Sequence, residues 1–361
     1  MKFSDSAKFW LVFSCILIAA FLGGILGNWV FIYLLDKYYG IPGGNYLASS
    51  SPSSVIIRDV KKAAIEQDSL LTKTVSSADK SFVKIFRKQA SSIYQPKDAI
   101  ATAVVMTSDG WLMTINNIAP SKNGTWEDYE AVTADRKVLA IETIKTDNIS
   151  KVSFIHLTNA KNLLVSGLIS SQDLSTGQTL VAVGFDGSVE TGRLSRDTST
   201  IYSSDTLFTK LFVTDFSGHD AYLFDDSGQL AGVSYNGSII AVNGVQKTLE
   251  RLLTEGKIIY PRLGVNYLDL TKVFDREARV GALITAPSKD VPAVVVGSPA
   301  EKSGLKSGDL ITALDDTPIN EFNNLTLLMQ DYSPGDTINL TIHRAKEVKN
   351  ISVKLDEFIV K

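Results

Sequence analysis

The stretch Ala101-Thr-Ala-Val-Val-Met-Thr-Ser-Asp-Gly-Trp-Leu-Met-Thr-Ile-Asn-Asn-Ile118 decides the fold, because two short β-type runs flank a Ser-Asp-Gly turn signal. Runs of the same kind, separated by Gly- and Asp-containing turns, occur along the chain at 81–86, 180–183, 211–214 and 230–233. Many short strands with frequent turns of this type are typical of a β-barrel or a β-sandwich. We therefore predict a mainly β domain over residues 57–255.

Helices are expected at both ends of this domain. Residues 60–71 are predicted to form a short helix before the first strand. At the other end, apolar residues recur at helical spacing, which predicts a closing helix over 245–254; they are Val245, Leu249, Leu252 and Leu253.

The N-terminal region is predicted to anchor the chain in a membrane. Residues 9–35 contain no charged residue, and a helix of about 20 apolar residues is enough to span a bilayer. The run is too long for a cleavable signal peptide, whose apolar part covers roughly 7–15 residues. Because Lys2 and Lys8 precede the run, the positive-inside rule puts residues 1–8 in the cytoplasm and the rest of the chain outside it. Residues 36–56, rich in Gly, Ser and Pro, are expected to form a flexible stalk.

The composition excludes several classes of function. A formal net charge of -3 gives no basic face for a nucleic-acid partner. The single cysteine, Cys15, excludes a disulfide framework and a cysteine metal cluster. A zinc site needs about three converging ligands, and the three histidines are dispersed at positions 156, 219 and 343. We expect no metal, no cofactor and no nucleic acid.

The order of the segments resembles the HtrA (high-temperature-requirement) family. Residues 101–118 align without a gap with the pattern GSGVIIS-DG-YILTNNHV of the first barrel in that family. Residues 177–195 resemble its second-barrel strand pair, and residues 223–233 resemble its LVNLDGEVIGI stretch. The resemblance implies a chymotrypsin-like double β-barrel over 57–255, followed over 256–361 by a PDZ domain of the circularly permuted HtrA type.

The resemblance also implies that the serine protease triad is degenerate. The positions of the histidine, the aspartate and the serine fall on Asn117, Lys151 and His219. An amide does not accept a proton near neutral pH, a lysine repels an imidazolium, and an imidazole is not a hydroxyl nucleophile. An oxyanion hole depends on a glycine-rich loop, and in the nucleophile loop only Gly218 remains, at a position where the family usually has a larger residue. We therefore predict no catalytic residues, and expect no imidazole, hydroxyl and carboxylate to meet in the groove between the barrels.

The C-terminal domain carries a predicted peptide site. By resemblance, the backbone N–H groups of Leu263, Gly264 and Val265 would hold a C-terminal carboxylate, and the peptide would add as a strand beside Val265, Asn266 and Tyr267. The side chains that would line the pocket for the last peptide residue, or that simply pack in the core, are Leu325, Leu328 and Met329. An apolar pocket favours C-termini that end in Val, Leu, Ile or Phe.

Three functions remain open at this stage. The first is a membrane-anchored pseudoprotease that binds unfolded or C-terminal peptide segments as a scaffold or regulator in envelope protein quality control. The second is an active serine endopeptidase of the envelope stress response, and the third is a structural role in envelope assembly. Family resemblance further implies a homo-oligomer, a trimer, with an active HtrA paralogue as a further partner.

Overall fold

The computed structural model describes residues 58–90, 93–115, 118–206 and 208–358, together with positions 13, 14, 16, 18–24, 26, 27 and 30. The chain divides into two units, Met1–Ala64 and Ile65–Lys361. The described positions between 13 and 30 are helical, and no helix in the described part of the chain is long and apolar enough to cross a membrane. The rest of the predicted anchor at 9–35, the stretch 1–8 and the predicted stalk at 36–56 lie outside the described residues.

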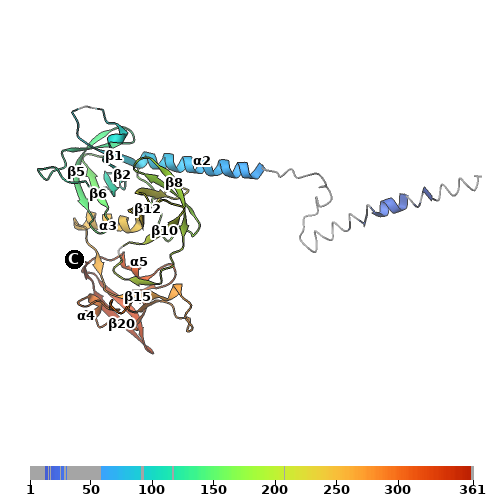
Figure 1. The fold of residues 1–361 in the computed structure, drawn as a ribbon. Helices are drawn as coiled ribbons and strands as arrows, with labels where there is room; N and C mark the ends of the chain where they lie inside the picture. The colour runs from blue at the N-terminus through green and yellow to red at the C-terminus, as the bar shows by residue number, and fades with distance from the viewer. Residues whose placement is uncertain are drawn as a thin grey trace, which may run out of the picture. The chain divides into compact units, whose positions relative to one another are not determined.

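Helix α2 spans Arg58–Ser81, so the prediction of a short helix over 60–71 was wrong about its end (Figure 1). The extra turns continue because Leu71, Val75 and Ala78 follow one another at spacings of four and three residues, on one helical face. All three pack against the main hydrophobic core of the protein, and Ala78 is fully buried. The burial of this face keeps the chain helical up to the first strand.

The first barrel is a closed sheet of six strands in the order β1-β2-β3-β6-β5-β4. Strand β1 pairs on one side with β2 and on the other with β4, which closes the sheet. The turn signal at 108–110 joins β2 to β3 as predicted. The elements are β1 (Phe82–Arg87), the 3-10 helix η1 (Pro96–Asp98), β2 (Ala101–Val105), β3 (Trp111–Thr114), β4 (Tyr129–Thr133), β5 (Val138–Thr146) and β6 (Ser153–Leu157).

The second barrel is also a closed sheet of six strands, in the order β10-β13-β12-β11-β7-β8. Helix α3 (Val242–Glu255) follows the barrel, as predicted from its apolar spacing, and ends on Gly256 in the left-handed conformation. One strand of this part of the sequence, β9 (Ile201–Ser203), does not belong to the barrel. The barrel strands are β7 (Thr179–Gly184), β8 (Val189–Ser195), β10 (Lys210–Thr214), β11 (Ala221–Phe224), β12 (Leu230–Tyr235) and β13 (Ser238–Ala241).

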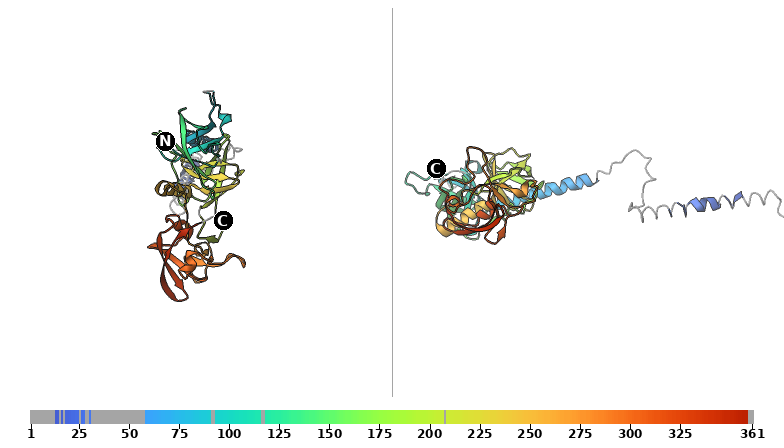
Figure 2. Two further views of the ribbon diagram at one scale, coloured as in Figure 1. Left: turned by 90° about the vertical axis from the view of Figure 1, so that its left-hand side faces the viewer. Right: turned by 90° about the horizontal axis from the view of Figure 1, so that it is seen from below.

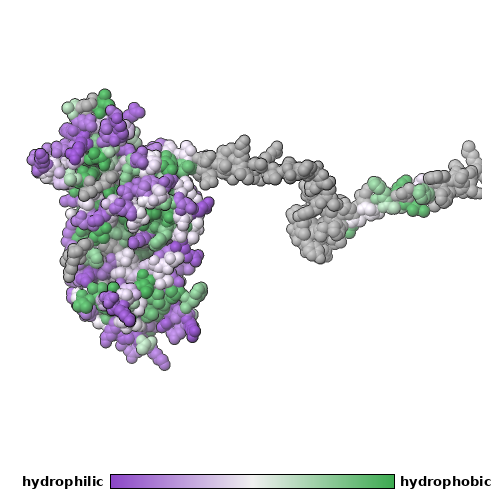
Figure 3. Space-filling model, in the orientation of Figure 1, coloured by the Kyte–Doolittle hydropathy of each residue, from purple (hydrophilic) through white to green (hydrophobic). Residues whose placement is uncertain are grey.

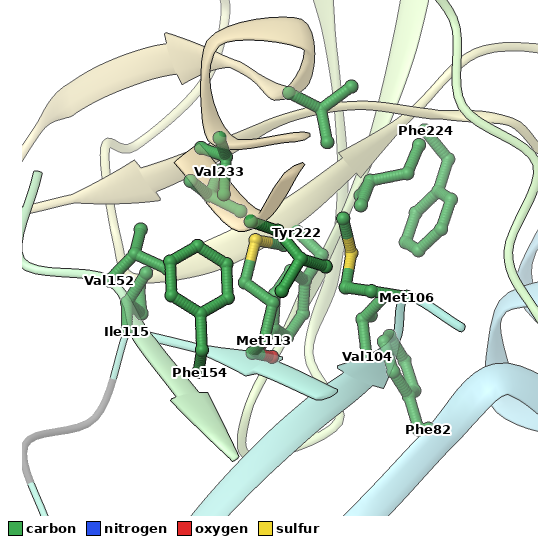
Figure 4. Packing of buried hydrophobic residues seen from close by; sticks show 14 of the residues in the cluster. Phe82, Val104, Met106, Met113, Ile115, Val152, Phe154, Tyr222, Phe224 and Val233 are labelled. Carbon is green, nitrogen blue, oxygen red and sulfur yellow. The ribbon is translucent and has the colours of Figure 1, made fainter. Parts of the chain in front are cut away.

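A shared hydrophobic core joins the two barrels, and Figure 4 shows its side chains converging from both. Tyr222 of the second barrel lies at its centre and is fully buried. Its hydroxyl donates to the backbone oxygens of Thr102 (2.8 Å) and Met113 (3.0 Å) in the first barrel. Burial raises the pKa of Tyr222 well above its ordinary value, so the hydroxyl stays protonated as a donor. The two barrels therefore form one packed body.

The C-terminal domain is built on a sheet in the order β20-β19-β17-β16-β15-β9, and β18 pairs with β17. The strands from β15 onward are orange to red in Figures 1 and 2. Its own core is separate from that of the barrels. The elements are β14 (Pro261–Arg262), β15 (Asn266–Asp269), η2 (Leu270–Lys272), β16 (Ala282–Ile284), α4 (Pro299–Lys302), β17 (Leu310–Leu314), β18 (Thr317–Pro318), α5 (Leu325–Met329), β19 (Thr337–Arg344), β20 (Glu347–Lys354) and β21 (Asp356–Glu357).

Two buried polar contacts connect this domain to the barrels. Arg251 of α3 donates to the backbone oxygens of Gln330, at the end of α5, and of Tyr332 (3.0 Å). The hydroxyl of Tyr260 donates to the buried carboxylate of Asp147 in the first barrel.

On the face drawn in Figure 3, hydrophobic residues of the described domains are scattered among hydrophilic ones, which is ordinary for a globular surface.

Candidate functional site

The structure describes two of the three positions predicted to replace the triad. Asn117 lies outside the described residues. Lys151 is exposed, has a φ of 64° and lines a cavity of about 310 Å³ between the barrels. His219 lies instead in a polar cluster formed by the β7–β8 turn and the loop before β11. Lys151 and His219 thus take part in two different local environments.

His219 is surrounded by hydroxyl and carboxylate groups of the second barrel. Its Nδ1 lies 2.8 Å from Ser217 Oγ, and its Nε2 lies 3.3 Å from Ser188 Oγ. The nearest Glu190 oxygen, Oε2, is 3.7 Å from Nδ1. The sequence predicted that no imidazole, hydroxyl and carboxylate would meet in the groove between the barrels. The cluster around His219 is formed by residues of the second barrel, and its carboxylate stays 3.7 Å from the imidazole. The β7–β8 turn folds against the loop before β11, which brings the imidazole and the hydroxyls together and the carboxylate near.

The geometry of this cluster does not match a proton relay. A triad needs a carboxylate hydrogen-bonded to the imidazole nitrogen that faces away from the nucleophile. Here that nitrogen contacts Ser217 Oγ, while Glu190 Oε2 accepts the backbone N–H of Ser217 at 3.0 Å. This hydrogen bond holds the pKa of Glu190 below its ordinary value, and those from Ser188 do the same for Asp186. The carboxylates of Glu190 and Asp186 are therefore ionised, and each accepts a backbone N–H, from Ser217 and Ser188 respectively.

Two further ionisable residues, Asp220 and His156, make their contacts elsewhere. Asp220 accepts the backbone N–H of Asn236, so it does not face the imidazole of its neighbour. His156 is on β6, where its ring stacks on Trp111 and its Nδ1 lies 2.7 Å from Glu142 Oε2. Among the described residues, no group of three or more His, Cys, Asp and Glu side chains is arranged to hold a metal ion.

In the predicted carboxylate loop of the C-terminal domain, the backbone donors already have acceptors within the chain. The backbone N–H groups of Leu263 and Gly264 both donate to Asp205 Oδ1, at 3.0 and 2.9 Å. The N–H of Val265 donates to Ser204 Oγ at 3.0 Å. Three consecutive N–H groups thus converge on one small acceptor site, which is the geometry that captures a carboxylate.

A glycine is required at the centre of this loop. Gly264 has a φ of 88°, a conformation that residues with a Cβ adopt only with strain. A Cβ atom at this position would lie 2.2 Å from the Cβ of Ser298. The loop therefore turns its N–H groups inward only because position 264 carries no side chain.

The remaining predicted site residues are mainly structural. Leu325 and Met329 of α5 and Tyr267 of β15 are buried in the core of the C-terminal domain, and Leu328 is partly buried against that core. Asn266 donates from Nδ2 to the backbone oxygen of Pro292 at 2.8 Å. Met329 alone of the three α5 residues also borders a small cavity beside the carboxylate loop.

Three residues at this site were missed by the sequence analysis: Ser204, Asp205 and Thr326. The first two follow β9, more than 50 residues before the loop that they contact. Thr326 Oγ1 donates to the backbone oxygen of Ser203 at 3.0 Å and lies 2.8 Å from the hydroxyl of Tyr267. No local pattern marks them, because a Ser-Ser-Asp turn is ordinary loop chemistry.

Comparisons with known proteins agree with this architecture. The family model "PDZ domain" matches residues 261–355. A "Serine protease Do-like HtrA" of Lactobacillus helveticus is 23% identical over 93% of this chain and 92% of its own length. A "Probable periplasmic serine endoprotease DegP-like" of Bartonella henselae is 27% identical over 72% of this chain, and a "Serine protease Do-like HtrA" of Bacillus subtilis is 27% identical over 62%. The matched regions span 53% and 56% of these last two relatives, about half their length.

Solved structures of the same kind are also similar. An "HtrA-type protease AlgW with tripeptide" covers 81% of this chain and 98% of its own, at 16% identity and a TM-score of 0.49. An "HtrA-type protease AlgW with decapeptide" covers 81% of this chain at 18% identity and a TM-score of 0.46. The PDZ match and the aligned relatives, together with the two β-barrels before the PDZ domain, support membership of the HtrA family.

Proposed function

We propose that this chain is a membrane-anchored HtrA-like pseudoprotease that binds C-terminal or unfolded peptide segments outside the cytoplasm, as a scaffold or regulator in envelope protein quality control. The observation that carries the proposal is the carboxylate loop, in which the N–H groups of Leu263, Gly264 and Val265 converge. Among the described residues, no carboxylate is hydrogen-bonded to the imidazole of His219, which supports the absence of proteolysis.

The proposal includes an arrangement in the envelope. Residues 9–35 would span the membrane, with residues 1–8 in the cytoplasm and the barrels and PDZ domain on the periplasmic or cell-surface side. The chain would assemble as a homotrimer, as the family resemblance implies, and mixed assembly with an active HtrA paralogue would let an inactive subunit regulate an active one.

The test is a hydrolysis assay on the purified full chain in detergent. We expect casein turnover at the level of the buffer, unchanged by His219→Ala, because no carboxylate of the cluster is hydrogen-bonded to the imidazole to orient it as a base. The control variant is Asp316→Ala, which changes an exposed carboxylate in the PDZ domain. Casein turnover that disappears with His219→Ala and survives Asp316→Ala would overturn the pseudoprotease.

One observation favours the second candidate, an active serine endopeptidase. The Ser188 hydroxyl lies 3.3 Å from Nε2 of His219, which is within reach of proton transfer. A fluorophosphonate probe followed by peptide mass spectrometry distinguishes the candidates, because such probes label activated serines. We expect no labelling of Ser188, whereas labelling that His219→Ala abolishes would favour the endopeptidase.

A further inference from the structure

A short strand from the barrel part of the sequence occupies the edge of the PDZ sheet. Strand β9 lies between β8 and β10 in sequence, yet it pairs antiparallel with β15. In this register Ser203 lies opposite Asn266, Tyr202 opposite Tyr267, and Ile201 opposite Leu268. An added peptide strand would use this same edge of β15, so the edge is already taken.

The residues after β9 supply a carboxylate at the loop. Asp205 Oδ1 accepts both the Leu263 and the Gly264 N–H, and the Asp205 side chain is only 9% exposed. Its other oxygen, Oδ2, lies 3.9 Å from Nε of Arg262. A peptide with a free C-terminus would need the same two N–H donors. Binding of that peptide and the present position of Asp205 therefore exclude each other.

The pocket for a last peptide side chain is also closed. A cavity of about 10 Å³ remains beside the loop, and Ser204, Thr206, Thr326 and Met329 are among its lining residues. Such a volume holds about one water molecule. The side chain of a valine or leucine cannot enter until the segment with Ser204 and Thr206 moves.

Polar contacts fix the start of the segment to the PDZ domain. The Tyr202 hydroxyl donates to Asp197 Oδ2 at 2.6 Å, and Lys272 Nζ of the PDZ domain lies 3.0 Å from the same oxygen. The Tyr202 and Tyr267 rings pack with their centroids 5.8 Å apart. The segment is thus held at its beginning, along its strand and at its end.

We propose that residues 201–205 are an internal ligand that closes the PDZ groove, with the Asp205 side chain in the place of a C-terminal carboxylate. The inference rests on the proposed function, because it describes how that same groove is regulated. The segment is tethered through β8 and β10, so it competes as an intramolecular ligand at an effective concentration in the mM range. The apparent affinity for a free peptide equals its intrinsic affinity multiplied by the fraction of molecules in which the groove is open.

The first experiment measures closure without any peptide. Hydrogen–deuterium exchange of the amides in 263–269 is compared by mass spectrometry for the full chain, Asp205→Ala and Tyr202→Pro, with Asp316→Ala as the matched control. Proline removes a backbone N–H from the middle of the β9–β15 pairing. We expect the amides in 263–269 to exchange about tenfold faster in Asp205→Ala and Tyr202→Pro than in the wild type. In Asp316→Ala the exchange rate should not change. Unchanged exchange in Asp205→Ala and Tyr202→Pro would overturn the internal ligand.

The second experiment measures peptide binding by fluorescence anisotropy. The probes are four fluorescein-labelled decapeptides that share a Gly-Ser body and end in Val, Leu, Ile or Phe, with amidated versions as controls. We expect at least one free-carboxylate probe to bind Asp205→Ala about tenfold more tightly than the wild type, and the amides to bind weakly. A peptide brings its own carboxylate, so losing the aspartate does not weaken its site.

Amide exchange and probe binding together distinguish the internal ligand from the proposed role of the groove as a receptor for C-termini. Faster exchange in Asp205→Ala, with no binding of any free-carboxylate probe by any variant, would support closure by residues 201–205 and overturn the groove as a C-terminus receptor. Equal probe affinity in the wild type and Asp205→Ala would overturn the internal ligand and leave the receptor standing. Circular dichroism of each variant confirms that the fold is retained.

Discussion

Replacing Arg344 with methionine is expected to destabilise the PDZ domain by about 3 kcal/mol, because it leaves a buried carboxylate without its cation. The Asp309 side chain is 1% exposed, and both of its oxygens accept from Arg344, Oδ1 from Nε and Oδ2 from Nη2, at 2.7 Å each. The pair joins the start of β17 to the end of β19. Arg344 therefore holds together two strands in the middle of the PDZ sheet.

The size of the effect follows from the surroundings of the carboxylate. Breaking a buried ion pair by removing one partner costs about 3–5 kcal/mol. We expect the lower end, because the Arg344 side chain is 29% exposed and water can reach part of the site. One hydrogen bond also survives, from the backbone N–H of Lys306 to Asp309 Oδ2 at 2.8 Å.

The assay is amide exchange in β17 and β19, combined with urea unfolding of the full chain followed by circular dichroism. A loss of about 3 kcal/mol corresponds to roughly a hundredfold faster exchange of the core amides. Arg344→Lys is the matched control, because lysine keeps the charge and loses the bidentate geometry. We expect it to fall between the wild type and Arg344→Met.

A double-mutant cycle tests the reasoning itself. Adding Asp309→Asn to Arg344→Met removes the unpaired charge, so the double variant should recover at least about 1 kcal/mol relative to Arg344→Met alone. If Arg344→Met unfolds at the wild-type urea concentration, or if the double variant is less stable than Arg344→Met, the carboxylate does not depend on the guanidinium and the reasoning is refuted.

Three further predictions concern other parts of the molecule. Arg251→Met should loosen the PDZ domain from α3 and expose the end of α5, which faster amide exchange at 328–332 would reveal. Gly264→Ala should abolish the protection of the carboxylate loop, since left-handed strain of about 1–2 kcal/mol adds to a clash with Ser298; unchanged exchange would contradict this. The hydrogen bonds from Arg279 hold the pKa of Asp275 at about 2, so this ion pair persists above that pH and is lost as the pH falls through it. Arg279→Gln should raise the NMR titration midpoint of the Asp275 carboxyl towards about 3.9, and an unmoved midpoint would exclude the ion pair as the cause.

The sequence predicted the strand pattern of the barrels well because the signals are local. A Ser-Asp-Gly turn between two apolar runs specifies a hairpin from the residues themselves, and β2 and β3 form as expected. The extent of α2 was missed for the opposite reason. Polar residues dominate the segment after Leu71, and only contact with the core makes Val75 and Ala78 part of a buried face.

At the candidate sites, too, local features could be predicted from the sequence, whereas tertiary contacts could not. The need for a glycine at position 264, whose φ is 88°, could be anticipated from residue type, and the resemblance predicts that His219 stands at the nucleophile position. The environment of His219 could not, because Ser188 and Glu190 lie about 30 residues away in sequence and approach it only when β7 and β8 close the barrel.

By itself, the sequence predicted a mainly β domain, since turn residues and apolar runs act over a few residues. Its resemblance to the HtrA family implied that this domain is a pair of β-barrels followed by a PDZ domain. The same resemblance predicts that Lys151 and His219 stand at two of the triad positions. Only the tertiary structure decided that the carboxylate of Asp205 meets the N–H groups of the PDZ loop. The contact joins residues 58 and 59 positions apart, and such long-range pairing depends on how two domains pack rather than on any local preference.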